Sequence, residues 1–342
     1  MKFGIFDHMD RAAVPLAQQY EDRLRLIEAY ERAGFYAYHI AEHHATPLGM
    51  APSPSVFLAA AAQRTRRLRL GPVVYPLAFH HPLRLAEEVC MLDHLSGGRL
   101  ELGVGRGASP YEMTYYGVEP ANAQAMYHEA FAVLMNFLTH RTLTFEGKFF
   151  NFRDVPVEIA PLQQPHPPLW YGAAYPDGVV WPARNNVNVV CNGPPATIRT
   201  ITDRYRAEWI AAGNDMAKLP LMAMSRFIVI ADSDAEALAI SRRGYARWYA
   251  SFILLWTKHG GKPVNAAYPD NFDDMQRTGL GIAGTAESVR DALARQIAVA
   301  QNNYQICRFA FGDLTLDESL RSLEQFTRVV MPALVDRREA AE

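Results

Sequence analysis

The chain has 342 residues, 49% of them hydrophobic and 20% charged, which is enough apolar material for one large domain or two smaller ones. Its formal net charge of −2 provides no electrostatic attraction to nucleic acid or to an anionic membrane. The cysteines Cys90, Cys191 and Cys307 are odd in number and far apart, which argues against a disulfide framework. We find no secretory h-region and no run of 18 uncharged apolar residues, so we expect a soluble, cytoplasmic protein.

Strand-like and helix-like patterns alternate along the first half of the chain. Residues 2–7 (KFGIFD) predict a strand, and the amphipathic helix after it ends at Gly34. Further strands are expected at 35–44, 67–77 and 98–107, each followed by a helical pattern, one of which opens at Pro82.

The second half keeps the same rhythm. Strands are predicted at 167–174, 187–192, 221–231 and 304–311. Ser233 with Glu236, and Thr315 with Glu318, have the spacing of capping boxes that open helices. About eight strand–helix units therefore follow one another, as in a (β/α)₈ TIM barrel of roughly 250 residues plus insertions. A doubly wound α/β sheet is the competing architecture, but the turn after the first strand lacks the glycines of a nucleotide loop. We predict a single barrel domain over residues 1–342.

Two stretches exceed a minimal barrel. Residues 141–167 contain four prolines and predict a hairpin-rich excursion. Residues 250–284 are long and rich in glycine and proline, and long connections of this kind often act as lids. We therefore expect a lid insertion there, as a long loop before the last strand–helix unit.

In a barrel of this kind, chemistry is located where the strands end. Four such ends carry distinctive residues: Glu42-His43-His44, Val73-Val74-Tyr75, Gly105-Arg106-Gly107, and residues 172–175. Adjacent histidines on a strand point to opposite faces, which disfavours one metal ion bound by both, so we expect no metal site.

The fourth predicted strand suggests room for a flat ligand. Leu100, Leu102 and Val104 alternate with Glu101, Gly103 and Gly105, and the two glycines would leave space above the barrel core. The stretch GVGRGAS matches a dinucleotide pattern only weakly, since it lies about 100 residues into the chain. Arg106 suits a single phosphate through its planar donor fork, and the alternative is a pairing with a neighbouring carboxylate.

The stretch from 33 to 44 (AGFYAYHIAEHH), the block from 64 to 107 and the element GTAESV at 284–289 resemble the bacterial luciferase-like flavin-dependent monooxygenase family. This resemblance implies an FMN-dependent monooxygenase that oxidises a small organic substrate with O₂ through a C4a-peroxyflavin. It also implies reduced FMN supplied by a separate NAD(P)H flavin reductase, and a homodimer.

The resemblance further implies roles for individual residues. His43 matches the family's essential histidine, and an imidazole that titrates near neutrality suits proton transfer. Glu42 would orient the loop or contact the flavin. Val73 and Val74 match a pair joined by a cis peptide bond beside the isoalloxazine, and Arg106 matches the arginine that holds the flavin phosphate.

Ala173, Ala174 and Tyr175 match the turn that wraps the ribityl-phosphate tail. Relatives often have acidic and hydroxyl side chains at positions 174 and 175 and a second arginine at Gln124, so phosphate binding would depend on Arg106 and backbone amides. A deazaflavin (F420)-dependent dehydrogenase on the same scaffold and a non-catalytic flavin-binding protein are the alternatives, ahead of a metal-dependent hydrolase.

Overall fold

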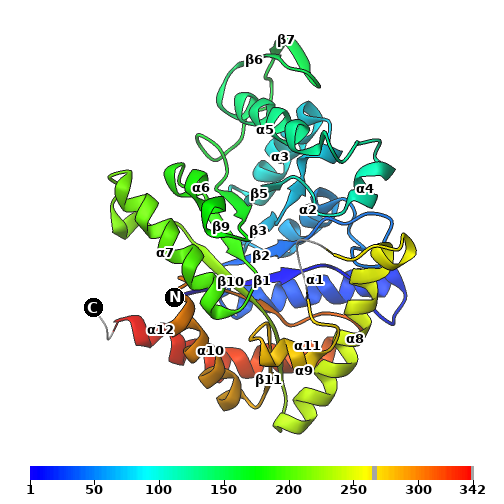
Figure 1. The fold of residues 1–342 in the computed structure, drawn as a ribbon, viewed down its shortest axis with the longest axis vertical. Helices are drawn as coiled ribbons and strands as arrows, with labels where there is room; N and C mark the ends of the chain where they lie inside the picture. The colour runs from blue at the N-terminus through cyan, green and yellow to red at the C-terminus, as the bar shows by residue number, and fades with distance from the viewer. Residues whose placement is uncertain (264–267, 340–342) are drawn as a thin grey trace.

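The computed structural model describes residues 1–263 and 268–339 and shows a ring of parallel strands surrounded by helices (Figure 1). The strands run β3-β2-β1-β12-β10-β9-β8-β5 in space, and a parallel bridge between Leu70 and Leu100 closes the ring. All eight predicted strands are present: β1 (Lys2–Asp7), β2 (Ala37–Ile40), β3 (Arg69–Pro72), β5 (Leu102–Gly105), β8 (Leu169–Gly172), β9 (Asn188–Cys191), β10 (Met222–Ile230) and β12 (Tyr304–Arg308). The predicted barrel is therefore confirmed.

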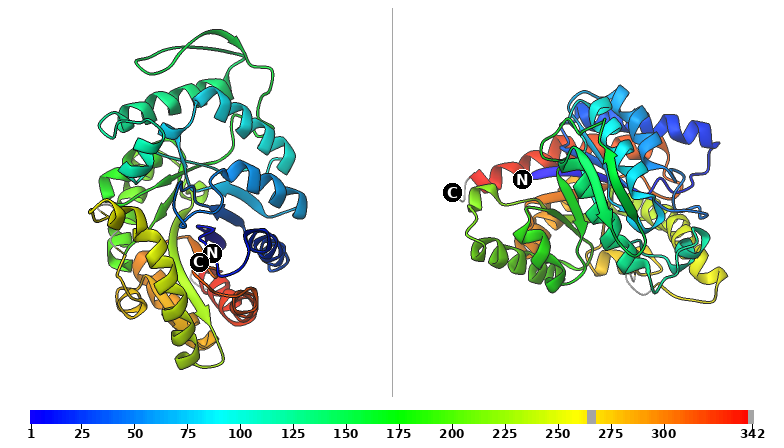
Figure 2. Two further views of the ribbon diagram at one scale, coloured as in Figure 1. Left: turned by 90° about the vertical axis from the view of Figure 1, so that its right-hand side faces the viewer. Right: turned by 90° about the horizontal axis from the view of Figure 1, so that it is seen from above.

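Helices form the outer layer of the barrel (Figure 2). Both predicted helix starts are found, because the side chain of Ser233 accepts a hydrogen bond from the Glu236 amide, and Thr315 and Glu318 form a complete capping box. The main helices are α1 (Leu16–Arg32), α2 (Pro54–Arg64), α3 (Pro82–Ser96), α5 (Ala123–Thr139), α6 (Val180–Arg184), α7 (Pro195–Ala211), α8 (Asp234–Lys258), α10 (Ala286–Ala300), α11 (Leu316–Gln325) and α12 (Met331–Glu339). Within the described part of the chain, none of the helices is long and apolar enough to cross a bilayer.

The glycines of β5 have a different role from the one expected. A Cβ on Gly103 would lie 2.2 Å from the carbonyl oxygen of Pro72, and a Cβ on Gly105 would lie 2.6 Å from Cγ2 of Val74. Both glycines therefore admit the neighbouring segment at Pro72–Val74, and the space that we assigned to a flat ligand is filled by that segment. The alternation itself is confirmed, since Leu102 and Val104 are buried in the main hydrophobic core.

The first predicted excursion is a hairpin. Strands β6 (Thr142–Glu146) and β7 (Asn151–Pro156) pair antiparallel and project away from the barrel beyond α5 (Figure 1). It leaves the ends of the barrel strands uncovered.

The second excursion, 250–284, is more regular than the long loop we expected. Helix α8 continues to Lys258, a short helix α9 spans Phe272–Arg277, and strand β11 (Gly281–Gly284) pairs with the carboxyl-terminal half of β10. Residues 264–267 of the predicted lid lie outside the described residues. The described part of 250–284 is therefore mainly helix and strand, and the lid itself stays a prediction.

Candidate active site

A cavity of about 480 Å³ lies where the parallel strands end. This size is in the range of small-molecule sites, and the carboxyl ends of barrel strands are the usual place for them. Segments far apart in the sequence build its wall, which consists of Phe6, Val73, Val74, Ala108, Gly172, Ala173, Ala174, Val190, Asn192, Gly193, Pro194, Tyr268, Leu280 and Arg308.

The segment after β3 has the backbone that the resemblance implied. The peptide bond between Val73 and Val74 is cis, and both side chains line the cavity. The short strand β4 (Tyr75–Pro76) then pairs with β5 and holds the segment in place.

His43 lies in a smaller pocket of about 60 Å³ beside the large cavity. Ala108 lines both spaces, so the two adjoin. The walls of the smaller pocket are mostly apolar and include Phe252, Leu255 and Trp256 from α8. At its polar end, the Nδ1 of His43 lies 3.3 Å from Oε1 of Glu112. When the imidazole is neutral and donates from Nδ1 to this carboxylate, Nε2 is left as a proton acceptor.

Glu112 was not identified as a site residue from the sequence. It lies in α4 (Pro110–Tyr115), a short helix capped by the side chain of Ser109, and is almost fully buried. The same carboxylate oxygen also accepts the backbone N–H of His44 at 2.6 Å. The sequence signal was the Ser109–Glu112 spacing of a capped helix directly after Arg106.

His8 is a second residue that we missed. It follows β1, and its ring stacks on that of His43 with centroids 5.7 Å apart. The indole Nε1 of Trp248 donates to its Nδ1 at 3.3 Å, and Phe6 meets its ring edge-on. Burial, and then the positive charges of Arg308 and His43, hold the pKa of His8 well below 6.5. His8 is therefore a neutral imidazole at physiological pH.

Glu42 lies on the other side of the loop. It accepts hydrogen bonds at 2.8 Å from Nε2 of His44 and from Nε2 of His80, and Nδ1 of His44 meets the hydroxyl of Tyr116 at 2.7 Å. These residues line a separate pocket of about 180 Å³. Glu42 thus connects His44 and His80 through hydrogen bonds and is absent from the wall of the large cavity.

The remaining predicted residues lie either in the cavity wall or on the exposed surface. Ala173 and Ala174 line it, whereas Tyr175 is 63% exposed. Arg106 is also exposed, and the acceptor of its hydrogen bond is the Gly107 carbonyl at 3.4 Å, not a carboxylate. Its exposed guanidinium is therefore available to an anion.

Arg308 was also missed. It shares a face of β12 with Tyr304 and Ile306, and this face points into the barrel. Its signal was a single charge inside the apolar run YQICRFAF, at the position where alternation carries it inward.

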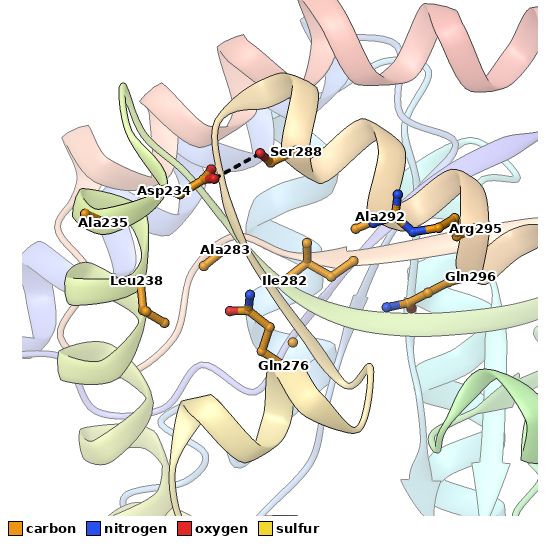
Figure 3. A pocket seen from close by; sticks show the side chains of 11 residues that line it. Asp234, Ala235, Leu238, Gln276, Ile282, Ala283, Ser288, Ala292, Arg295 and Gln296 are labelled. Atoms are coloured by element: carbon orange, nitrogen blue, oxygen red, sulfur yellow. Dashed lines mark hydrogen bonds between the residues drawn. The ribbon is translucent and has the colours of Figure 1, made fainter.

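A different cavity, of about 520 Å³, lies on the outside of β11 between α8 and α10 (Figure 3). Its main acidic group, Asp234, is already bonded to the Ser288 hydroxyl and the Thr285 amide. No cluster of three or more metal-binding side chains occurs among residues 1–263 and 268–339. We therefore place the candidate active site at the strand ends.

Comparison with known proteins agrees with this arrangement. A family model described as "Luciferase-like monooxygenase" matches residues 1–303. The chain belongs to this family, which makes it an oxidoreductase enzyme, and the resemblance seen in the sequence is confirmed.

The individual relatives span nearly the whole chain. An uncharacterised protein of Sinorhizobium fredii is 44% identical, with 94% of this chain and 93% of that one covered. The oxygenase component of the flavin-dependent trigonelline monooxygenase of Acinetobacter baylyi is 27% identical, with 99% and 98% covered. The crystal structure of the monooxygenase RslO1 from Streptomyces bottropensis aligns with a TM-score of 0.87 at 27% identity, over 97% of this chain and 99% of that one.

Two more distant structures show the same fold with different cofactors. One is the oxygenating constituent of 3,6-diketocamphane monooxygenase from Pseudomonas putida in complex with FMN (TM-score 0.80, 20% identity, 97% and 98% covered). The other is the coenzyme F420-dependent tetrahydromethanopterin reductase of Methanopyrus kandleri (TM-score 0.71, 20% identity, 97% and 98% covered).

Proposed function

We propose that the protein is the oxygenase component of a two-component monooxygenase that takes reduced FMN from a separate NAD(P)H-dependent reductase and oxidises a small organic substrate with O₂. The observation that carries the proposal is the pair of adjoining spaces at the strand ends: a large cavity beside the cis Val73–Val74 bond and a small apolar pocket that contains His43. The volume of the large one is in the range of ligand sites, and the small one places His43 beside it.

The wall of the large cavity fits FMN. Val73 and Val74 would offer an apolar surface to the flavin ring, and the backbone at Ala173 and Ala174 would be available to the ribityl chain. Arg106 would bind the phosphate at the rim through its donor fork. Reduced FMN, when bound, supplies the electrons with which oxygen is activated.

His43 would transfer the proton that the reaction requires. Its Nδ1 contact with Glu112 fixes the ring, and Nε2 remains for proton exchange. Phe252, Leu255 and Trp256 would exclude bulk water from the pocket, since water discharges activated oxygen as hydrogen peroxide. The apolar walls favour a substrate with a hydrophobic body.

The relatives support this proposal by their names, since the trigonelline enzyme is an oxygenase component and is flavin-dependent. The FMN complex with the same fold supports FMN as the cofactor. The homodimer, the cytoplasmic location and the lid remain predictions from the sequence.

The test is a titration of the purified chain with FMN and with F420, oxidised and reduced, followed by oxygen pulses. We expect reduced FMN to bind more tightly than F420 and the bound reduced flavin to be oxidised by O₂. Tighter binding of F420 together with inertness to oxygen would favour the dehydrogenase. Flavin binding without any oxygen-dependent product in a screen of apolar substrates would favour a flavin-binding protein.

A further inference from the structure

Arg308 is a buried cation whose bonding is incomplete. Its side chain is 3% exposed, yet it lines the large cavity at the strand ends. Its Nε donates to Ser225 Oγ at 2.9 Å, and its Nη2 lies 3.3 Å from both Asn192 Oδ1 and the Tyr268 hydroxyl. Among the described residues, no group accepts a hydrogen bond from its Nη1.

All of these acceptors are neutral. The aromatic rings around the guanidinium are neutral as well, with Phe6 and Phe227 each 4.6 Å from its central carbon. Among the described residues, no carboxylate forms an ion pair with Arg308. A buried charge normally has a partner of opposite sign, because removing it from water costs several kcal/mol.

The neighbouring ionisable group cannot supply that partner. His8 lies close enough for Arg308 to lower its pKa, and a neutral imidazole carries no negative charge. Because Arg308 lines the large cavity, a molecule bound there can supply the counter-charge.

We infer that Arg308 binds a delocalised anionic edge of the molecule that occupies the large cavity. A guanidinium fork pairs best with two acceptor atoms in one plane. Two sources offer that chemistry here: the N1–C2=O edge of a reduced, anionic flavin, and the carboxylate of a substrate. The first source rests on the proposed function, and the second does not.

The fork is also linked to the α8–α9 connection. The same Nη2 that contacts Asn192, at the end of β9, contacts Tyr268. A ligand that binds to Arg308 would therefore also affect the contact between Arg308 and Tyr268, which lines the same cavity.

The test measures dissociation constants of the variants R308Q and R308K and of the native chain, anaerobically, for oxidised FMN, reduced FMN and benzoate. Thermal unfolding shows which variants fold, and R308K keeps both the charge and the length if R308Q does not fold. R226K is the matched control, since Arg226 is a fully buried arginine of β10 that donates to Gln296 and is absent from the cavity wall.

If the partner is the flavin edge, R308Q weakens the binding of reduced FMN by about 10-fold to 100-fold, as expected for loss of a hydrogen bond to a charged group. The binding of oxidised FMN is weakened much less. The potential of the bound flavin then falls. If the partner is a substrate carboxylate, only benzoate binding weakens, by a similar factor. In either case R308K loses less binding affinity than R308Q, and the dissociation constants of R226K match those of the native chain.

Native affinities for all three ligands in a folded R308Q, or in R308K where R308Q does not fold, would overturn the inference. If the native chain itself fails to bind FMN, the proposed function fails, and the benzoate measurement still decides whether Arg308 binds an anion.

Discussion

His43 and His44 are neighbours in sequence but belong to two different sites. His43 lies in an apolar pocket, stacked on His8, with one hydrogen bond to Glu112. His44 lies in a polar cluster, held between Glu42 and Tyr116. Adjacent side chains on an extended segment point to opposite sides, so one residue separates the site to which we assign proton transfer from a site to which we assign support of the loop. The comparison can be tested by removing each histidine separately.

The largest effect is expected from His43→Ala. Loss of a general acid–base group lowers the rate of the step that it assists by about 10²-fold to 10⁴-fold. We expect substrate oxidation to fall by that factor, while the dissociation constant for reduced FMN stays within about twofold of native. His128→Ala, on the exposed side of α5, is the control. Unchanged turnover in the His43 variant would remove its assigned role.

His44→Phe should affect stability first. It would leave the buried Glu42 with a single imidazole donor from His80, and a buried polar group that loses a partner costs roughly 1–3 kcal/mol. We expect the free energy of unfolding in urea to fall by about that amount and the rate per folded molecule to fall much less than for His43→Ala. A native free energy of unfolding combined with lost turnover would mean that the two histidines have been assigned the wrong way round.

Glu112 touches both sides of the loop, and Glu112→Gln separates its two contacts. The amide oxygen can still accept the backbone N–H of His44, but the negative charge beside His43 is lost. Loss of a charge-assisted hydrogen bond of about 1.5 kcal/mol predicts a roughly tenfold lower rate. Steady-state kinetics measure this, and a rate equal to native would show that the contact with His43 has no part in turnover.

His8→Phe should change how the free energy of unfolding depends on pH. Because the pKa of His8 is lowered in the folded state, the unfolded chain binds a proton below pH 6.5 that the folded chain does not. The contribution of His8 to stability is therefore fully present above pH 6.5 and is lost as the pH decreases below it, by up to about 1.4 kcal/mol per pH unit.

Phenylalanine keeps the ring stack and removes the proton, so the variant should lose less stability between pH 7 and pH 5. His39, whose pKa burial lowers to about 3, retains part of the slope in both proteins. Identical urea midpoints for the variant and the native chain across this range would show that His8 is not buried as a neutral ring.

The sequence patterns predicted the barrel because each strand and helix is a local feature with its own period. They also placed His43 and His44 at the end of the second strand, and the alternation rule separated the two side chains. Glu112, His8 and Arg308 were missed because their importance depends on closure of the barrel, which brings residues from β1, α4 and β12 to one loop. The prediction of space for a ligand at Gly103 and Gly105 was wrong for the same reason. The segment at Pro72–Val74, which fills that space, is brought there only by the folded barrel.

The most direct test of the central claim is a crystal structure of the chain with FMN bound. We predict the phosphate within hydrogen-bond distance of Arg106 and the ring against Val73–Val74, with its edge turned toward the pocket of His43. A phosphate bound elsewhere, for example in the cavity between α8 and α10, or a ring outside the strand ends, would contradict the account.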